Sequence, residues 1–181
     1  DGYVWYFERL SDSTLMLRQG AAMDPFHAFD VGSYAAPFAA DWDDDGDLDL
    51  LVGDYDGYVW YFERLSDSTV VLRQGAAMDP FHAFDVGSYA APFAADWDDD
   101  GDLDLLVGNP GGVKYFERRK DTTLVLRHGA AADPSHAFDV GGRAAPFAAD
   151  WDDDGDLDLL VGNPGGVKYF ERRKDTTLVL R

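Results

Sequence analysis

A stretch of about 55 residues recurs along this chain, and the recurrence limits the folds that the chain can adopt. Residues 1–53 align with residues 56–108 and differ from them at only two positions. A third copy follows at a spacing of 54, because one Gly-rich turn is a residue shorter than its counterpart. Repeats of this length each form one supersecondary unit, and neighbouring units bury a shared core by stacking.

The copies form a single segment, residues 1–181. A segment around Tyr-Phe-Glu-Arg occurs four times and an aspartate-rich loop occurs three times. We therefore expect about three and a third units, as an incomplete array or as part of a larger ring. The missing units would come from the same polypeptide or from other copies of it. The expected boundaries are approximately 1–35 (a partial unit plus its linker), 36–90, 91–144 and 145–181.

Each repeat contains four short β-strand patterns separated by turn residues. In the first full repeat the expected strands are 36–40, 48–52, 58–63 and 69–73, and a long connection follows. Four-stranded antiparallel sheets in tandem predict an all-β fold built of β-propeller blades, since such sheets bury both faces by stacking around an axis. A β-solenoid is the alternative, although its repeats are usually shorter.

The most acidic motif is the loop DWDDDGDLD, which begins at residues 41, 96 and 150. Carboxylates at loop positions 1, 3, 5 and 9 can converge on one point, and the backbone carbonyl at position 7 can supply a further oxygen. Glycine at position 6 permits the sharp turn, and an all-oxygen shell of this kind suits Ca²⁺ better than Mg²⁺. The sequence predicts about one Ca²⁺ per loop, three in all. The predicted ligands are Asp41, Asp43, Asp45, Asp47 and Asp49; Asp96, Asp98, Asp100, Asp102 and Asp104; and Asp150, Asp152, Asp154, Asp156 and Asp158.

An acidic run can also be an ordinary solvated loop. Three copies with the same spacing, the same glycine and the same apolar flanks argue against that interpretation, because like charges packed so closely repel one another without a cation. The loop differs from an EF-hand, since its twelfth position is Val52 rather than glutamate and its flanks are typical of strands.

The motif PFAADWDDDGDLDLLVG, at residues 37–53, 92–108 and 146–162, resembles the FG-GAP/VCBS repeat family. The resemblance covers essentially the whole chain. It implies a β-propeller with calcium bound between the first two strands of its blades, and it assigns calcium ligands to loop positions 1, 3, 5 and 9. The family includes integrin α-subunit head domains, seven-bladed fungal lectins and large secreted or surface proteins. An extracellular or cell-surface location therefore follows from the resemblance, with the lumen of an organelle as the alternative.

The formal charge of −20 argues against nucleic acid as a partner, because phosphates would be repelled. The longest apolar runs are only a few residues, so no membrane span is predicted. Cysteine is absent, which excludes disulfides and thiolate metal sites.

Two further positions recur with the repeats. Trp42, Trp97 and Trp151 follow the first loop aspartate and are expected to pack against the neighbouring blade, with sugar stacking as the alternative. His27, His82 and His136 are expected to have surface or packing roles. Paired Glu-Arg residues in every repeat are expected to form exposed cross-strand ion pairs of low energy.

No motif for nucleophilic catalysis, phosphate binding or dinucleotide binding is present. The sequence therefore favours a calcium-stabilised, non-catalytic binding or scaffolding module with a protein or glycan ligand. A carbohydrate-binding lectin with sugar sites between blades is the alternative, and the propeller domain of a hydrolase is a third hypothesis.

Overall fold

The computed structural model describes residues 2–127, 140–174 and 177–181. Every regular element within these residues is a β-strand, and they contain no helix. An N-terminal hairpin comprises β1 (Tyr6–Arg9) and β2 (Leu15–Arg18). Three four-stranded sheets follow, and we call them the first, second and third blades. Their strands are β3 (Ala36–Ala40), β4 (Asp49–Gly53), β5 (Val59–Arg64) and β6 (Val70–Arg73); β7 (Ala91–Ala95), β8 (Asp104–Asn109), β9 (Gly112–Arg118) and β10 (Leu124–Leu126); and β11 (Ala145–Ala149), β12 (Asp158–Asn163), β13 (Gly166–Arg172) and β14 (Leu178–Leu180).

Each blade is an antiparallel meander in which strands pair in the order of the sequence. The strands expected in the first blade agree with the observed ones to within about one residue. The hairpin β1–β2 has the sequence of the third and fourth strands of a blade. These sheets confirm the prediction of an all-β fold made of propeller blades.

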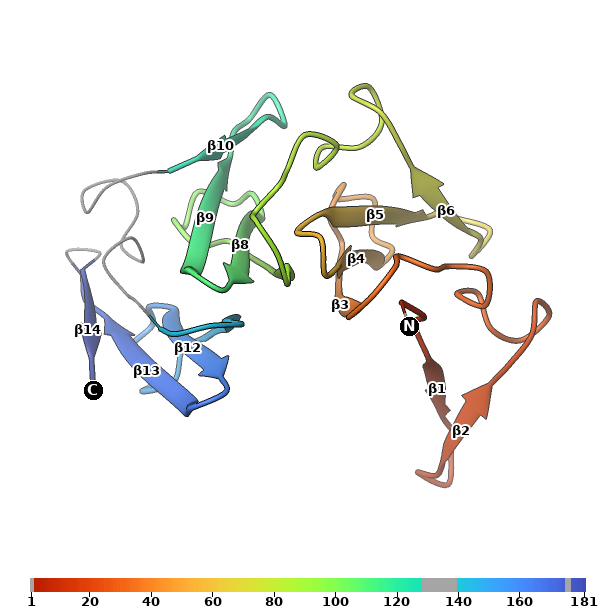
Figure 1. The fold of residues 1–181 in the computed structure, drawn as a ribbon, viewed down its shortest axis with the longest axis horizontal. Helices are drawn as coiled ribbons and strands as arrows, with labels where there is room; N and C mark the ends of the chain where they lie inside the picture. Colours follow the sequence, from red (N-terminus) through yellow and green to blue (C-terminus); the bar gives the residue numbers. More distant parts are fainter. Residues whose placement is uncertain (1, 128–139, 175–176) are drawn as a thin grey trace.

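The blades lie side by side along an open arc (Figure 1). The first strands β3, β7 and β11 contact their counterparts in the next blade, so they lie on the inner side of the arc. The fourth strands β6, β10 and β14 lie at its periphery (Figure 1). The sheets do not close into a ring, which agrees with the expectation of an incomplete propeller.

In the part of the chain that the structure describes, two complete linkers fill the space between successive sheets, and we number them by the blade that follows. The second linker, residues 74–90, packs its Phe81 against Trp42 of the first blade, with ring centroids 4.9 Å apart. Its Phe84 stacks on Phe116 of the second blade at 4.4 Å. Phe81 is only 1% exposed, so the interface between the first and second blades is a three-layer core of blade, linker and blade. The first linker, residues 19–35, stacks Phe29 on Phe62 of the first blade in the same manner.

Glycine permits the closest approach between blades. A Cβ atom added to Gly53, at the end of β4, would lie 2.0 Å from the carbonyl oxygen of Ala90 before β7. Gly108 meets Ala144 in the same way at 1.9 Å. Any side chain at these positions would push neighbouring blades apart.

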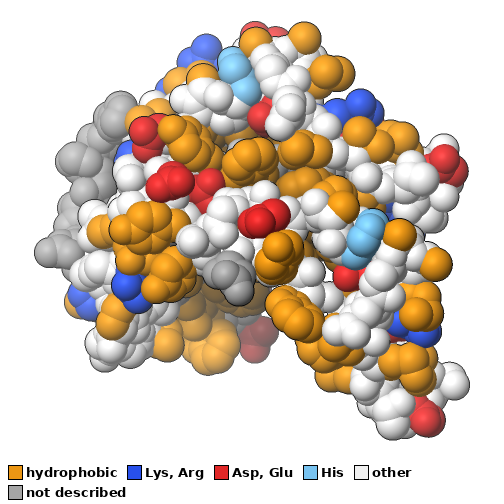
Figure 2. Space-filling view, turned by 45° about the vertical axis from the view of Figure 1, so that its right-hand side comes forward, with side chains coloured by type: hydrophobic (Ala, Val, Ile, Leu, Met, Phe, Trp, Pro, Cys, Tyr) orange, Lys and Arg blue, Asp and Glu red, His pale blue; other side chains and the backbone are white. Residues whose placement is uncertain are grey.

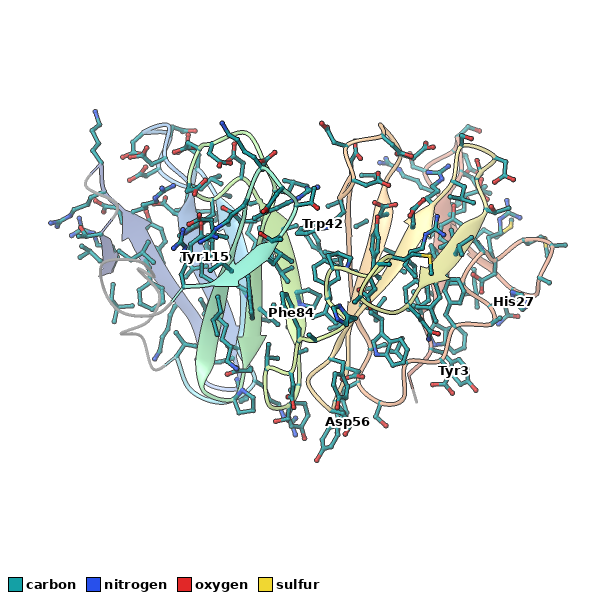
Figure 3. All side chains as sticks on the ribbon, turned by 90° about the horizontal axis from the view of Figure 1, so that it is seen from above. Tyr3, His27, Trp42, Asp56, Phe84 and Tyr115 are labelled. Carbon is teal, nitrogen blue, oxygen red and sulfur yellow. The ribbon has the colours of Figure 1, made fainter. Side chains whose placement is uncertain are left out.

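The meander separates two kinds of loop. The aspartate loops join the first two strands of each blade, and the turns between the second and third strands lie at the opposite edge of the sheet. Figure 3 shows this separation, with Asp56 of one such turn at the edge away from the aspartate loops. All three aspartate loops therefore share one rim of the array.

Candidate metal centre

The backbone of each aspartate loop is wound by two residues with left-handed dihedral angles. Asp44 has φ 64° and Gly46 has φ 94°, and the other two loops repeat these values to within a few degrees. Aspartate and glycine tolerate this region better than other residues do. The spacing of acids and glycine in the sequence thus sets the local turn.

Hydrogen bonds within the loop hold its carboxylates in place. The amides of Asp45 and Gly46 donate to the two carboxylate oxygens of Asp41, at 3.1 and 3.0 Å. The amide of Asp47 donates to Asp45 at 2.9 Å. The same three bonds recur in the loops that begin at Asp96 and Asp150.

The carboxylates at positions 1, 3 and 5 converge in every loop. One oxygen from each of Asp41, Asp43 and Asp45 can be chosen so that all three lie within 4.8 Å of one another. The other two loops bring together Asp96, Asp98 and Asp100, and Asp150, Asp152 and Asp154. Each cluster could hold one metal ion through oxygen ligands.

The aspartate at position 9 is buried beside this cluster but is not one of its three converging residues. Asp49 accepts hydrogen bonds from the amides of Trp42 and Arg64, at 3.2 and 2.8 Å, and from the Tyr61 hydroxyl at 3.0 Å. Asp104 and Asp158 have the equivalent three partners. These bonds attach the loop to the third strand of its own blade. A ligand role for position 9, and for the carbonyl at position 7, stays a prediction.

The loop carboxylates repel one another. Burial, together with the charges of Asp49 and Asp45, raises the pKa of Asp43. Burial likewise raises the pKa of Asp98, with the neighbouring Asp100 as the next cause. Burial raises the pKa of Asp104 to about 7, and the charge of Asp98 adds to this shift. A cation in the cluster would relieve this unfavourable crowding.

The fold and these loops agree with a comparison against known families. The model of the FG-GAP-like repeat matches residues 41–107 and 96–161. The chain belongs to the FG-GAP-like repeat family. No curated protein sequence matched it significantly. The matched region contains all three aspartate loops of the FG-GAP blades.

Two of the tryptophans beside the carboxylate clusters, Trp42 and Trp97, join successive FG-GAP blades. Trp42 is 3% exposed, and the guanidinium carbon of Arg118 lies 5.0 Å from its ring centroid. Arg172 lies 5.1 Å from the ring of Trp97 in the same way. Trp151 of the third blade is 62% exposed. The packing expected of these residues is thus seen for Trp42 and Trp97.

The role of these arginines differs from the one expected. Each glutamate of the Glu-Arg pairs binds the arginine near the end of the fourth strand, as in the two contacts of 2.6 and 2.7 Å between Glu63 and Arg73. In the second and third blades the arginine next to the glutamate turns to the preceding blade instead, as Arg118 does. Arg9 and Arg64 contact Ser13 and Ser68 on their own turns. Recurrence of an arginine at this position was the only signal in the sequence, and it did not identify the partner.

Two hollows of similar composition lie between blades. One, of about 750 Å³, lies beside the first linker and includes Tyr6, Glu8 and His27. The other, of about 570 Å³, lies beside the second linker and includes the equivalent Tyr61, Glu63 and His82. Both described histidines are exposed, in accord with a surface role, whereas His136 lies outside the described residues.

A cluster of tyrosines lies near the inner strands, and sequence reasoning did not find it. The rings of Tyr34, Tyr55 and Tyr89 lie 4.7 to 5.8 Å apart. Arg143 lies over Tyr89 at 4.3 Å and donates to its hydroxyl at 2.9 Å. Tyr34, Tyr89 and Arg143 occupy the same repeat position and all have φ between 51° and 57°. Bulky residues rarely adopt this conformation, so the packing of the loops must enforce it.

Proposed function

We propose that this chain is a calcium-stabilised, non-catalytic module for binding or scaffolding. The observation that carries the proposal is the convergence of three aspartate carboxylates in each of three equivalent loops. Membership of the FG-GAP-like repeat family supports it. Asp41, Asp43 and Asp45 would hold the ion in the first loop, together with the Asp47 carbonyl and the Asp49 carboxylate.

Calcium fits this donor set better than magnesium does. The donors are oxygens on a tight loop that is partly open to water, and Ca²⁺ accepts irregular shells of six to eight oxygens whereas Mg²⁺ requires a near-ideal octahedron. The ion would offset the repulsion among the carboxylates and hold the first two strands of each blade in register. The protein would thus use the ion for structure rather than for a reaction.

The tyrosine cluster is our candidate for contact with a protein partner. Tyr34 and Tyr55 are exposed, and Arg143 holds Tyr89 in place from the next blade. Tyrosine and arginine are the residues most often responsible for binding energy at protein interfaces. Asp56 and Asp85 flank the cluster in the sequence of its loops, so a partner with basic side chains would complement it.

Chelation tests the structural role of calcium. We expect the thermal midpoint to fall by several degrees when Ca²⁺ is replaced by a chelator at pH 7.5, measured by circular dichroism. Asp43→Asn should reduce the stabilisation by calcium, whereas Asp44→Asn, at the neighbouring exposed position, should not. A thermal midpoint that is the same with calcium and with chelator would refute the proposal.

Carbohydrate binding is the second candidate function, and the two hollows between blades favour it. Their linings repeat an aromatic ring, a carboxylate and a histidine, which are groups that contact sugars through C–H faces and hydroxyls. A glycan array probed with the calcium-loaded chain would test it. Binding that is lost in the His82→Ala variant, at an exposed residue of the second hollow, would support a lectin, and an array without signals would exclude one.

None of the described residues forms a helix that is both long and apolar enough to cross a bilayer. We propose an extracellular or cell-surface location. Extracellular calcium modules work with dissociation constants of 10⁻⁴ to 10⁻³ M, which exposed loops of this kind can reach.

A further inference from the structure

The three aspartate loops are connected by polar and aromatic contacts across the blade interfaces. In the first loop, Trp42 lies between the converging residues Asp41 and Asp43. Its carbonyl oxygen accepts a hydrogen bond of 2.7 Å from Nη1 of Arg118, and its ring faces the same guanidinium. Arg118 lies at the end of β9 in the second blade. The first loop is therefore held by a side chain of the next blade.

The backbone of the same arginine continues the connection into the second loop. The amide of Arg118 donates to Oδ1 of Asp104 at 2.8 Å. Oδ2 of Asp104 accepts the amide of Trp97 at 3.2 Å. Trp97 lies between Asp96 and Asp98, the first two converging residues of the second loop. One arginine thus contacts the aspartate loop of one blade with its side chain and the buried Asp104 of the next loop with its backbone.

The second interface shares the arginine over a tryptophan ring and the bond from the arginine amide, but the polar contact of its guanidinium is different. The guanidinium of Arg172 lies over the ring of Trp97, and its Nη1 is 3.8 Å from the carboxylate of Asp99 in the second loop. The amide of Arg172 donates to Asp158 at 2.8 Å. Asp158 in turn accepts the amide of Trp151 in the third loop at 3.1 Å. Arg172 is buried, as expected for a residue that joins two blades.

We propose that Arg118 and Arg172 are positioning residues that couple cation binding in neighbouring loops. This inference rests on the proposed binding of calcium to the loops. The coupling would be positive: an ion at one loop orders its tryptophan, the tryptophan holds the arginine, and the arginine aligns the buried aspartate and the tryptophan of the next loop. The second ion then binds to a loop that is already partly ordered, at a lower entropic cost.

Arg64 provides a matched control. It occupies the same position in the first blade, and its amide donates to Asp49 as those of Arg118 and Arg172 donate to their own aspartates. Its guanidinium, however, contacts Ser68 on the neighbouring turn at 3.5 Å rather than a loop tryptophan. Arg64→Met and Arg118→Met therefore remove the same groups, but only the second removes a connection between loops.

The test measures calcium affinity at the second loop while the first loop is intact or disabled. Trp97 is the reporter, in chain labelled with 5-fluorotryptophan and followed by fluorine NMR during titration with CaCl₂. The double change Asp43→Asn and Asp45→Asn disables the first loop. We expect it to weaken calcium binding at Trp97 about fivefold or more in the parent chain, which is the range of typical allosteric couplings. It should have the same effect in Arg64→Met and no effect in Arg118→Met.

The outcomes separate this inference from the proposed function. If calcium binds at Trp97 and disabling the first loop never changes its affinity, the coupling is wrong and the calcium sites stand. If no calcium binds to the parent chain, both proposals are wrong. If Arg118→Met does not fold, the comparison of intact and disabled first loops in the parent chain still tests the coupling. An unchanged calcium affinity at Trp97 in that comparison would contradict it.

Discussion

At the scale of single residues, two opposing effects act on the ionisation of the buried aspartates at loop position 9. Asp104 is fully buried and accepts three hydrogen bonds that favour its ionised form. Burial and the charge of Asp98 oppose ionisation and raise its pKa to about 7. Its ionised form is therefore costly in the absence of a cation.

This conflict predicts how stability without metal depends on pH. A carboxyl group with a higher pKa in the folded state than in the unfolded state binds more protons when folded, so stability rises as pH falls through the folded pKa. With chelator present, we expect the free energy of unfolding to increase by about 1 kcal/mol between pH 8 and pH 6 from Asp104. Urea unfolding at several pH values would measure it.

The control for this prediction is Asp104→Asn, which cannot ionise. Its stability in chelator should change less with pH than that of the parent chain. An increase in parent stability as pH rises from 6 to 8 would contradict the sign of the shift.

At the scale of strands and linkers, glycine decides how closely blades approach. The Cβ of an alanine at Gly108 would lie 1.9 Å from the backbone carbonyl oxygen of Ala144, the residue before β11. Among the described residues, the equivalent Gly162 in the third blade has only Ala145 of its own sheet nearby, at 3.9 Å. Both glycines lie in second strands with the same local sequence.

We expect Gly108→Ala to destabilise the chain by about 2 kcal/mol or more, because the backbone of one blade must shift. Gly162→Ala should change stability by much less. Chemical denaturation of both variants in calcium would test the pair. Equal losses of stability in the two variants would mean that alanine perturbs the strand itself rather than the contact between blades.

At the scale of the whole molecule, negative charge and exposed apolar surface are the two features that act against stability. The chain carries a formal charge of −20, concentrated at the rim that holds the three aspartate loops. Apolar side chains are also exposed, and Figure 2 shows them gathered on the projecting N-terminal hairpin, where Trp5, Phe7 and Leu15 are more than half exposed. Self-repulsion and exposed apolar surface both reduce the stability of the isolated array.

Cations should therefore stabilise the chain in two distinguishable ways. NaCl should raise the thermal midpoint gradually through screening. CaCl₂ at a few millimolar should raise it more than NaCl of the same ionic strength, because only bound ions neutralise the clustered carboxylates. MgCl₂ provides the control for divalent charge. If CaCl₂ and NaCl raise the thermal midpoint equally at matched ionic strength, the stabilisation comes from screening alone.

Local patterns were sufficient for much of this molecule. The repeat length, the turn residues and the alternation of apolar residues located the strands to within about one residue, since pairing within a blade joins segments close in the sequence. The convergence of Asp41, Asp43 and Asp45 also follows from local chain geometry, because five residues and one glycine form the whole turn.

Only the tertiary structure decided what lies between blades. Arg118 and Trp42 are 76 residues apart, and nothing in the sequence around either residue specifies the other. The tyrosine cluster and the two hollows depend in the same way on how sheets and linkers stack. The sequence by itself determined the blades and their acidic turns through short-range sterics and hydrogen bonding. The stacking of blades, which depends on side-chain packing between distant segments, determined the contacts that join those turns.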